Sequence, residues 1–599
     1  MTAIATRRRR ALAGERGGVG GRGGLGGQAV RLSPPWSRSR VELTAAAVVF
    51  AVIAVWAIWR TQIWDVAAIF GEGRQAMADF LFGTALRDGA LPPRFGDVGQ
   101  LLDKVVETFF IAVAGTFIAA VLSLPLAFLA ARSTTPNRVV WMVARGIIAF
   151  ARTVPDVIFA FVFVRVYRIG PLPGMLAIGL HAIGMVGKLM ADAIEQADPG
   201  PRQAVAAQGG SWLQQLSTGV LPQVVPSFLA TVLFRLDINF RSSTVLGLVG
   251  AGGVGQLFMQ YTGNLRWDLA MGVVAATVVT VLLVDQLSNR VRRALLGSAV
   301  GTAPPARGHR SVRPAQVLDP DRLVPPFDAY RRRLAMFAAG AAVLVVGSWW
   351  YTGVSLRNLL TGLRPQLGEP DAGQLPSVWY VARRLIPFDF ATFTPKLDWW
   401  NSLVRTALFD TVATGFAAAT IGILLALPLG YLAARTVAPN RVVYQAMRGL
   451  LVLIRAVPEL VIAVVLVVAL GLGLIPGVVA LVIGVVGFGG KLFADAIEDV
   501  QPGPCEGVRS VGTSRVQEAM TAVTPQFVPA LVGQGLYLLD ICIRSSTVLG
   551  IVGAGGVGAL LSNYLQASRF EEAGGILICV FAVVFAIERL SDWLRARLL

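Results

Sequence analysis

Apolar runs of about 20 residues recur along the whole chain, and no other feature restricts its fold as strongly. The hydrocarbon core of a bilayer is about 30 Å thick, and an α-helix rising about 1.5 Å per residue needs about 20 residues to cross it. Barrel strands are about half as long and alternate in polarity, so the runs predict helices. We therefore expect an all-α integral membrane protein.

The composition agrees with this class. Of the 599 residues, 55% are hydrophobic and 15% are charged, whereas soluble domains carry about 25% charged residues. The mean hydropathy is +0.64. The chain has 53 Lys and Arg against 35 Asp and Glu, and its Arg residues cluster between or before apolar runs. This placement marks the cytoplasmic side of a membrane, so we expect contact with membrane lipid and not with nucleic acid.

Few residues of this chain are of the types that form disulfides, bind metal ions or catalyse reactions. Cys505, Cys542 and Cys579 form no CxxC motif, and the only histidines are His181 and His309. Neither a disulfide framework nor a metal site is predicted. No nucleophile–base set is evident, so no catalytic residue is predicted either.

The chain repeats itself at an offset of 303 residues, as from Arg241 to Arg544. The segment Pro136–Val140 (PNRVV) returns as Pro439–Val443. The segment Arg241–Gly255 (RSSTVLGLVGAGGVG) matches Arg544–Gly558 at 14 of 15 positions. The sequence therefore predicts two copies of one membrane module in a single chain.

Six spans are expected in each copy, giving about twelve transmembrane helices in two tandem repeats. In copy one they lie near 41–59, 105–131, 141–166, 172–191, 222–249 and 268–287. In copy two they lie near 334–351, 405–434, 444–470, 474–494, 525–552 and 574–591.

Charge predicts how the copies are oriented. Residues 1–40 hold nine Arg and one Glu, and residues 290–333 hold ten Arg and three Asp. We expect a disordered basic cytoplasmic tail and a cytoplasmic linker, with six spans between them and the two copies parallel. The tail is not expected to be a secretory signal, because no apolar region directly follows its arginines.

The expected domains are the tail 1–40, copy one 41–289 with a core at about 105–287, the linker 290–333, and copy two 334–599 with a core at about 405–591.

The loop after each fourth span predicts a docking element. Glu506–Gly512 precedes Thr524-Pro525 in copy two, and Gln203–Gly209 precedes Leu221-Pro222 in copy one. This pattern indicates a short helix, a glycine break, a second short helix and a proline-started span. Connecting loops normally vary, so its repetition favours docking over an ordinary loop. The candidate docking residues are Gln203, Ala204, Gly209, Pro222, Glu506, Gly507, Gly512 and Pro525.

Two arginines are predicted near the middle of the bilayer. Arg241 and Arg544 lie nine residues before a glycine turn, or about 13 to 14 Å along a helix. A buried guanidinium needs a partner, and Asp237 and Asp540 lie four residues earlier on the same helix face. Either each pair only locks its helix, or the arginines line a path for an oxyanion. The candidate pathway residues are Arg241, Ser242, Ser243, Thr244, Arg544, Ser545, Ser546 and Thr547.

The glycine turns are candidate gates. They match G-x-G-x-x-G, but each follows a membrane helix and lacks an acidic residue about twenty positions later, which argues against dinucleotide binding. We expect flexible turns on the outer side. The residues are Gly250, Gly252, Gly253, Gly255, Gly553, Gly555, Gly556 and Gly558.

Two further positions are of interest. Arg152 and Arg455 precede a helix proline by three residues and are expected to support a kink or to face the path. His181 aligns with Gly484 and is expected to be a packing residue.

Three features together resemble the permease of phosphonate-type ABC importers, over roughly 105–290 and 405–595. They are the docking loops, the motif Arg-x-Val-Pro at Arg152–Pro155 and Arg455–Pro458, and the segment Arg-Ser-Ser-Thr-Val-Leu-Gly with the glycine turn that follows it. The loop resembles the EAA-type coupling loop of that class, although copy one has Gln203 where copy two has Glu506.

The resemblance implies two cytoplasmic ABC ATPase subunits on the loops, an extracytoplasmic solute-binding protein, and a pathway by alternating access for phosphonate, phosphate or a related oxyanion. It also implies a multi-pass protein of the bacterial inner membrane with cytoplasmic termini. Gly490-Lys491 lacks the first glycine and the Ser or Thr of a P-loop, so ATP and Mg are expected on the partner subunits and no cofactor on this chain. A secondary transporter with two six-helix halves is the alternative.

Overall fold

The computed structural model describes residues 38–65, 73–84, 87–296, 327–365, 374–386, 388–389, 394–395 and 402–598. Residues 1–37 of the expected tail and residues 297–326 of the expected linker lie outside this range. The chain divides after Val49 into two compact units. Of the first unit the structure describes the start of helix α2 (Arg38–Thr61), and every later element belongs to the second.

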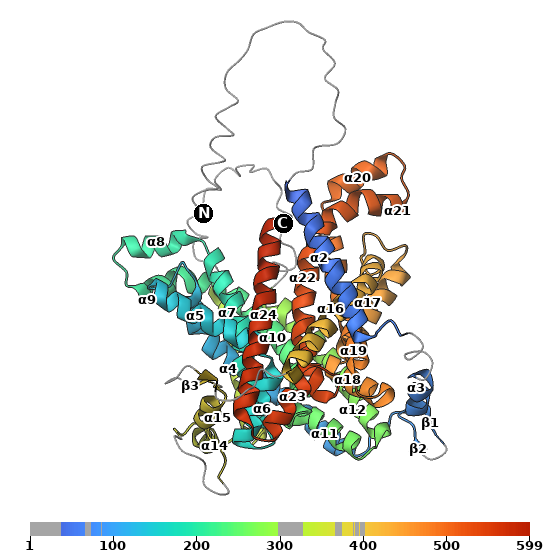
Figure 1. Cartoon of the computed structure of the whole chain (residues 1–599). Helices are drawn as coiled ribbons and strands as arrows, with labels where there is room; N and C mark the ends of the chain where they lie inside the picture. Colours follow the sequence, from blue (N-terminus) through green and yellow to red (C-terminus); the bar gives the residue numbers. More distant parts are fainter. Residues whose placement is uncertain are drawn as a thin grey trace. The chain divides into compact units, whose positions relative to one another are not determined.

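The described ranges are helical apart from two antiparallel hairpins of two-residue strands, which confirms the all-α prediction (Figure 1). In the first hairpin, β1 (Gly83–Thr84) pairs with β2 (Arg87–Asp88), with Gly83 opposite Asp88. In the second, β3 (Phe388–Asp389) pairs with β4 (Thr394–Pro395), with Phe388 opposite Pro395.

The two copies contain the same succession of long helices. After α2, copy one continues with α3 (Gly73–Phe82), α4 (Val98–Ala130), α5 (Arg138–Thr153), α6 (Asp156–Tyr167), α7 (Pro171–Gln196), α8 (Pro199–Ala207), α9 (Trp212–Gln214), α10 (Leu221–Gly247), α11 (Gly253–Gly263) and α12 (Trp267–Leu296). Copy two contains α13 (Phe327–Tyr351), α14 (Leu356–Gly362), α15 (Val378–Arg384), α16 (Ser402–Leu432), α17 (Arg441–Ala456), α18 (Glu459–Leu470), α19 (Leu474–Glu498), α20 (Pro502–Ser510), α21 (Arg515–Glu518), α22 (Thr524–Leu549), α23 (Val557–Gln566) and α24 (Phe570–Leu598).

Eight of the described helices are long and apolar enough to cross a membrane, or up to 11 spans if each of three bent helix pairs counts as one. The first expected span is represented by a shorter apolar helix, Ala47–Thr61. The expected number of about twelve is therefore reached only when the bent pairs and this shorter helix are included. The domain limits proposed from the sequence stay a prediction.

The third expected span of each copy is not a single helix, which corrects the prediction. The segment 141–166 is divided between α5 and α6, which meet at 88°, and 444–470 between α17 and α18, at 78°. The cause is Pro155 or Pro458, because a proline lacks the N–H of a helix and pushes the preceding residue into an extended conformation. Val154 adopts it, with φ −76° and ψ 121°.

The repeated PNRVV motif starts these broken helices. The side chain of Asn137 accepts a hydrogen bond from the Val140 amide at 2.8 Å, and Asn440 accepts one from Val443 at the same distance. An asparagine in this position satisfies an amide that the first turn of the helix leaves unpaired.

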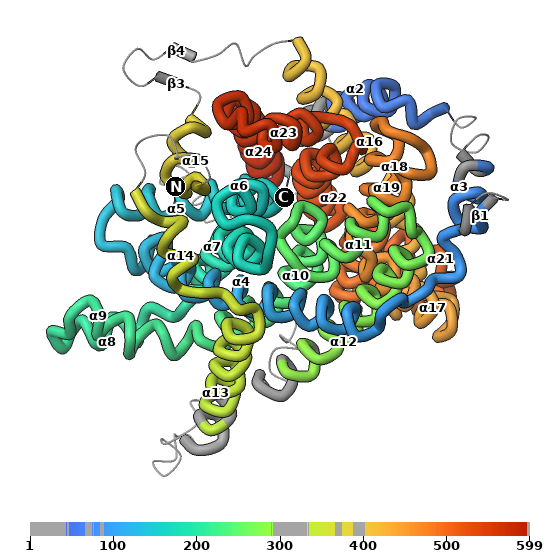
Figure 2. Tube along the Cα trace, turned by 90° about the horizontal axis from the view of Figure 1, so that it is seen from below, coloured from blue at the N-terminus to red at the C-terminus, as the bar shows by residue number. Residues whose placement is uncertain are grey.

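The copies exchange their first helices. The α2 residue Arg60 forms an ion pair with Asp410 of α16 at 2.8 Å. In the opposite direction, the α13 residue Tyr351 donates to Asp103 of α4 and lies 5.1 Å, ring to ring, from Phe110. Figure 2 shows α13 beside α4 and α2 beside α16. The first helix of each copy therefore packs against the core of the other.

Within each copy, the fourth long helix packs closely on the break in the third. A Cβ atom added to Gly184 of α7 would lie 2.4 Å from the backbone nitrogen of Arg152. A Cβ added to Gly487 of α19 would lie 3.2 Å from the backbone nitrogen of Arg455. Glycine at these positions lets the break approach the helix backbone.

We expect Gly184→Ala to lower the stability of the chain, because its methyl group would overlap the backbone at Arg152. The loss should be about 1 to 3 kcal/mol, measured as a lower thermal unfolding midpoint of the purified chain in detergent. Gly146→Ala is the matched control, since Gly146 lies in α5 with no atom within 4 Å of an added Cβ. Equal midpoints for the two variants would contradict the close packing.

Candidate functional site

Each helix break is closed by an arginine from the opposite copy. Nη1 of Arg544 in α22 donates to the carbonyl oxygen of Arg152 at 3.0 Å. Nη1 of Arg241 in α10 donates to the carbonyl oxygen of Arg455 at 3.4 Å. Because α5 ends at Thr153 and α17 ends at Ala456, the last carbonyls of these helices have no partner in a following turn, and the arginines supply donors for them.

The same arginines pair with the aspartates four residues earlier. Nη2 of Arg544 lies 2.7 Å from Asp540, and Nη2 of Arg241 pairs with Asp237. Asp237 is buried, and the side chains of both arginines are largely buried. Each guanidinium thus joins a carboxylate on its own helix to a carbonyl of the other copy.

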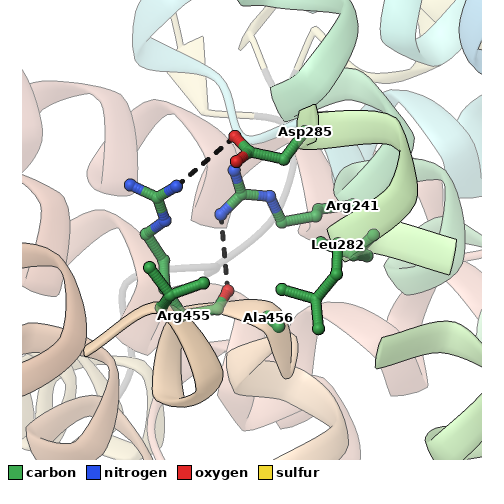
Figure 3. Close-up of a pocket in the computed structure, with 7 residues that line it drawn as sticks. Arg241, Leu282, Asp285, Arg455 and Ala456 are labelled. Carbon is green, nitrogen blue, oxygen red and sulfur yellow. Dashed lines mark hydrogen bonds and ion pairs between the residues drawn. The ribbon is translucent and has the colours of Figure 1, made fainter. Parts of the chain in front are cut away.

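The arginines at the breaks pair across the copies as well. Arg152 forms an ion pair with Glu588 of α24, and Arg455 lies 3.6 Å from Asp285 of α12. Figure 3 shows Arg241, Arg455 and Asp285 around one small cavity of about 10 Å³, which is the size of about one water molecule. We call this set the junction: Arg152, Arg241, Arg455, Arg544, Asp237, Asp285, Asp540 and Glu588.

The junction leaves hydrogen-bonding capacity unused. Within the described residues, Nε of Arg241 and Nε of Arg544 are buried without a partner, as is one oxygen each of Asp237 and Asp540. An unmade hydrogen bond of a buried group costs about 1 to 3 kcal/mol. The junction therefore surrounds a small space and keeps two donors and two acceptors that have no partner among the described residues.

The structure separates the hydroxyl residues that we grouped with the arginines. Ser243 donates to the Thr108 carbonyl at 3.2 Å, and Ser546 donates to the Thr411 carbonyl at 2.9 Å, so both face the second helix of their own copy. Thr547 donates within its helix, and Thr244 lines a mostly apolar cavity beside Pro458. Ser242 and Ser545 are half-buried next to the arginines, and Ser545 bonds Glu459.

The glycine turns adopt backbone conformations that favour glycine and are bonded to neighbouring helices. Three glycines in each turn have positive φ, between 73° and 93°: Gly250, Gly252, Gly253, Gly553, Gly555 and Gly556. Val254 donates to the Thr108 hydroxyl at 2.8 Å, and Val557 donates to Thr411 at 2.8 Å. A Cβ on Gly255 or Gly558 would lie within 2.0 Å of a threonine carbonyl oxygen. These contacts fix each turn against its own copy.

The candidate docking loops are short helical hairpins, which we call the elbows: 199–220 in copy one and 502–523 in copy two. Gly209 and Gly512, with φ +77° and +80°, separate α8 from α9 and α20 from α21. A π-helical segment then joins the second short helix to the long one, Gln215–Val220 before α10 and Ala519–Val523 before α22. The helical backbone continues from each second short helix into the long helix, and Pro222 and Pro525 lie in the first turn of α10 and α22, as the predicted starts have it.

A glutamine clamps each elbow to its long helix. Gln223 accepts from the Asp198 amide at 3.0 Å and donates to the Asp198 carbonyl at 3.1 Å. Gln526 makes the same two bonds to Gln501, at 3.0 and 3.5 Å. The start of each elbow is thereby bonded to the first turn of α10 or α22.

The elbows differ in their internal bonding. In copy two, Arg509 makes two bonds to Glu518, at 2.6 and 3.1 Å, and this carboxylate raises the pKa of Arg509 above its usual value. Burial, with Glu518 nearby, raises the pKa of the Cys505 thiol. In copy one Ala206 and Gln215 stand at the places of Arg509 and Glu518, and Gln215 instead accepts a longer bond, of 3.4 Å, from Arg202, which aligns with Cys505.

The elbows carry exposed side chains. Gln203, Ala204, Glu506 and Gly507 are exposed, as are Gly209, Gly512, Pro222 and Pro525. Large apolar side chains lie beside them, among them Leu213 on one elbow and Val511, Val516 and Met520 on the other. In Figure 1 the elbows lie toward the upper end of the view, and α11 and α23, which follow the glycine turns, toward the lower end.

Several residues of the site were missed in the sequence. Asp285 and Glu588 occupy aligned positions in the last helix of each copy, as do Thr108 and Thr411 in the second. The offset of 303 residues marks them as repeated polar positions within apolar segments. The sequence does not indicate which of these residues contact each other, because the partners lie hundreds of residues apart.

Two regions, residues 123–297 and 426–599, match the model of the family described as binding-protein-dependent transport system inner membrane component. Over 518 residues the chain is 44% identical to the phosphate-import permease protein PhnE of Mycolicibacterium smegmatis, covering 86% of this chain and 88% of the relative. Over 252 residues it is 37% identical to the phosphite transport system permease protein PtxC of Stutzerimonas stutzeri, covering 42% and 89%. Over 119 residues it is 38% identical to the putative cryptic phosphonate transport system permease protein PhnE2 of Escherichia coli, covering 20% and 98%.

We expect Glu588→Gln to destabilise the chain by about 3 kcal/mol, because it leaves the Arg152 guanidinium unpaired in the junction. Thermal unfolding in detergent measures the loss. The control is Glu572→Gln, whose partner Arg569 is largely exposed, and about 0 to 1 kcal/mol is expected there. The double variant Arg152→Gln with Glu588→Gln should regain part of the loss; no recovery would argue against the pair.

Proposed function

The chain belongs to the family of binding-protein-dependent transport system inner membrane components, and on this premise we propose that it forms the membrane pathway for a phosphorus oxyanion. As a member it is a multi-pass permease subunit of an ABC importer and not a secondary transporter. The relatives named for phosphate, phosphite and phosphonate support the substrate class.

The observation that carries the substrate proposal is the junction. Four arginines lie in two pairs between the copies, and one arginine of each pair has a buried Nε donor without a partner among the described residues. A guanidinium offers a rigid fork of donors that fits tetrahedral oxyanions, and charge-assisted bonds of this kind are the strong ones. Opening the junction would free the donors that now bind the helix-break carbonyls.

The elbows are the proposed docking sites of two ABC ATPase subunits, which would bind and hydrolyse ATP with Mg outside this chain. The exposed apolar side chains Val511, Val516 and Met520, set among charged neighbours, support a protein contact there. Gln203 in copy one and Glu506 in copy two occupy the same place, so the two contacts would differ in charge.

A transport cycle follows from these connections. The ATPases would draw the elbows together, and the clamps at Gln223 and Gln526 would pass this motion to α10 and α22. Moving these helices withdraws Arg241 and Arg544 from the breaks of the opposite copy and opens the path. A solute-binding protein would deliver substrate at the opposite end, near the glycine turns. We place the elbows and both termini in the cytoplasm, in accord with the arginine-rich segments.

Replacement of the elbow residues should abolish uptake. Glu506→Arg reverses an exposed charge, and Gly512→Ala places a side chain at φ +80°, which strains the break between α20 and α21. We expect weaker co-purification with the ATPase and a loss of substrate uptake of about tenfold or more. Gly449→Ala, with no atom within 4 Å of the added Cβ, is the control for the glycine change. An intact complex with full uptake would refute docking at the elbows.

Arg241→Ala should reduce transport more than it reduces the amount of chain in the membrane. Uptake of labelled phosphate, phosphite and methylphosphonate, compared with expression in the same cells, measures both. If expression and uptake fall in parallel, Arg241 serves only to lock the helix with Asp237.

A further inference from the structure

The two sides of the junction are not equivalent, although the copies repeat. Asp156 begins α6 beside the break in copy one, and Glu459 begins α18 at the aligned place in copy two. Glu459 is one methylene longer than Asp156 and fills the space next to Gly484 of α19. A Cβ added to Gly484 would lie 2.4 Å from a carboxylate oxygen of Glu459. In copy one that position is His181, which lies 3.0 Å from the Val154 carbonyl.

The strongest difference is Arg235 in α10. It is 5% exposed, and its copy-two counterpart is Leu538. Nη1 of Arg235 lies 3.3 Å from the sulfur of Met185, a weak acceptor, and Nε has no partner. Among the described residues no carboxylate lies within ion-pair distance of it. A buried cation so weakly bonded costs several kcal/mol, which indicates a group that completes the site.

The groups near Arg235 come from both copies. Nη1 of Arg235 contacts Met185 of α7, which follows Gly184 at the copy-one break. Nη1 of Arg544 donates to the Arg152 carbonyl at the same break. Asp156, His181 and Tyr537 are the other titratable side chains around these arginines. The Asp156 carboxylate accepts the Val157 amide at 2.9 Å, at the start of α6. Tyr537 keeps 38% of its surface exposed, so the cluster is accessible from one side. Two guanidinium groups from different copies therefore approach the same helix break, with the phenol of Tyr537 near them.

The aligned place in copy two lacks this character. Leu538 and Phe234 replace Arg235 and Tyr537, and the carboxyl group of Glu459 lies there with Ser545. Both places have an acid, Asp156 in copy one and Glu459 in copy two, so the difference lies in Arg235 and Tyr537: in copy two an anion would meet one arginine, Arg241, beside apolar side chains. The chain thus offers one favourable side and one unfavourable side to an anion.

We propose that Arg235 of copy one and Arg544 of copy two together bind the transported phosphorus oxyanion, at a single off-axis position on the copy-one side of the junction. The proposal rests on the proposed function and specifies its site. The oxyanion supplies acceptors for the buried Nε donors of both arginines, and the Tyr537 hydroxyl donates a further hydrogen bond. One position implies one oxyanion per transport cycle.

The test uses the full chain assembled with its ATPase subunits and binding protein in proteoliposomes, with labelled inorganic phosphate as the probe. Initial uptake and ATP hydrolysis are measured together, at saturating phosphate. For Arg235→Leu, which introduces the copy-two residue, we expect phosphate imported per ATP to fall about tenfold, with ATP hydrolysis within about twofold of wild type. Leu538→Met is the control at the aligned position and should keep the ratio.

Each outcome decides the proposal. An unchanged phosphate-to-ATP ratio in Arg235→Leu overturns the site while leaving the importer function intact. If wild type imports neither phosphate, phosphite nor methylphosphonate, the proposed function itself fails. If Arg235→Leu does not assemble, Arg235→Lys is used, because it keeps the charge but loses the planar fork. If Arg235→Lys imports about threefold less phosphate per ATP than wild type, the result supports the site. If its phosphate-to-ATP ratio equals that of wild type, the proposal is overturned and Arg235 has a structural role.

Discussion

A carbonyl freed inside a bilayer needs a donor, and here each of two broken helices receives its donor from the other copy. Pro155 and Pro458 create the need, and Arg544 and Arg241 meet it. The same guanidinium groups also pair with Asp540 and Asp237. Each arginine side chain therefore connects a carboxylate of its own copy to the helix break of the other copy. The bonding of the helix breaks and the contact between the copies therefore depend on the same side chains.

The exchange of first helices strengthens this dependence. The α2 segment in the second unit binds α16 through Arg60 and Asp410, and α13 binds α4 through Tyr351 and Asp103. Neither copy has its complete set of neighbours alone. Fusion also lets the copies diverge, since residues such as Arg235 and Leu538 occupy aligned positions with different chemistry. Two identical subunits would carry such a residue on both sides.

Much of the architecture was predictable from the residues. Hydrophobic length and the 303-residue offset indicated two parallel helical modules, and the glycine break predicted the elbow hairpins at Gly209 and Gly512. The Asp–Arg spacing indicated pairs within α10 and α22. The single spans at 141–166 and 444–470 were wrong, because the apolar pattern continues through Pro155 and Pro458 while the backbone turns. Threonines of α4 and α16 bind the glycine turns, which the glycine motif alone did not indicate, and the gate role of these turns stays a prediction.

The sequence by itself determined the class of protein, the duplication and the identity of the polar residues in apolar segments, because hydrophobicity and periodicity are local properties. Only the tertiary structure decided that Arg544 binds the Arg152 carbonyl, that Arg455 pairs with Asp285, and that the first helices cross between copies. In a tandem repeat, a contact within one copy and the same contact between copies leave the same pattern in the sequence. The packing of the helices, with close approaches such as that at Gly184, decides whether a contact forms within one copy or between the two copies.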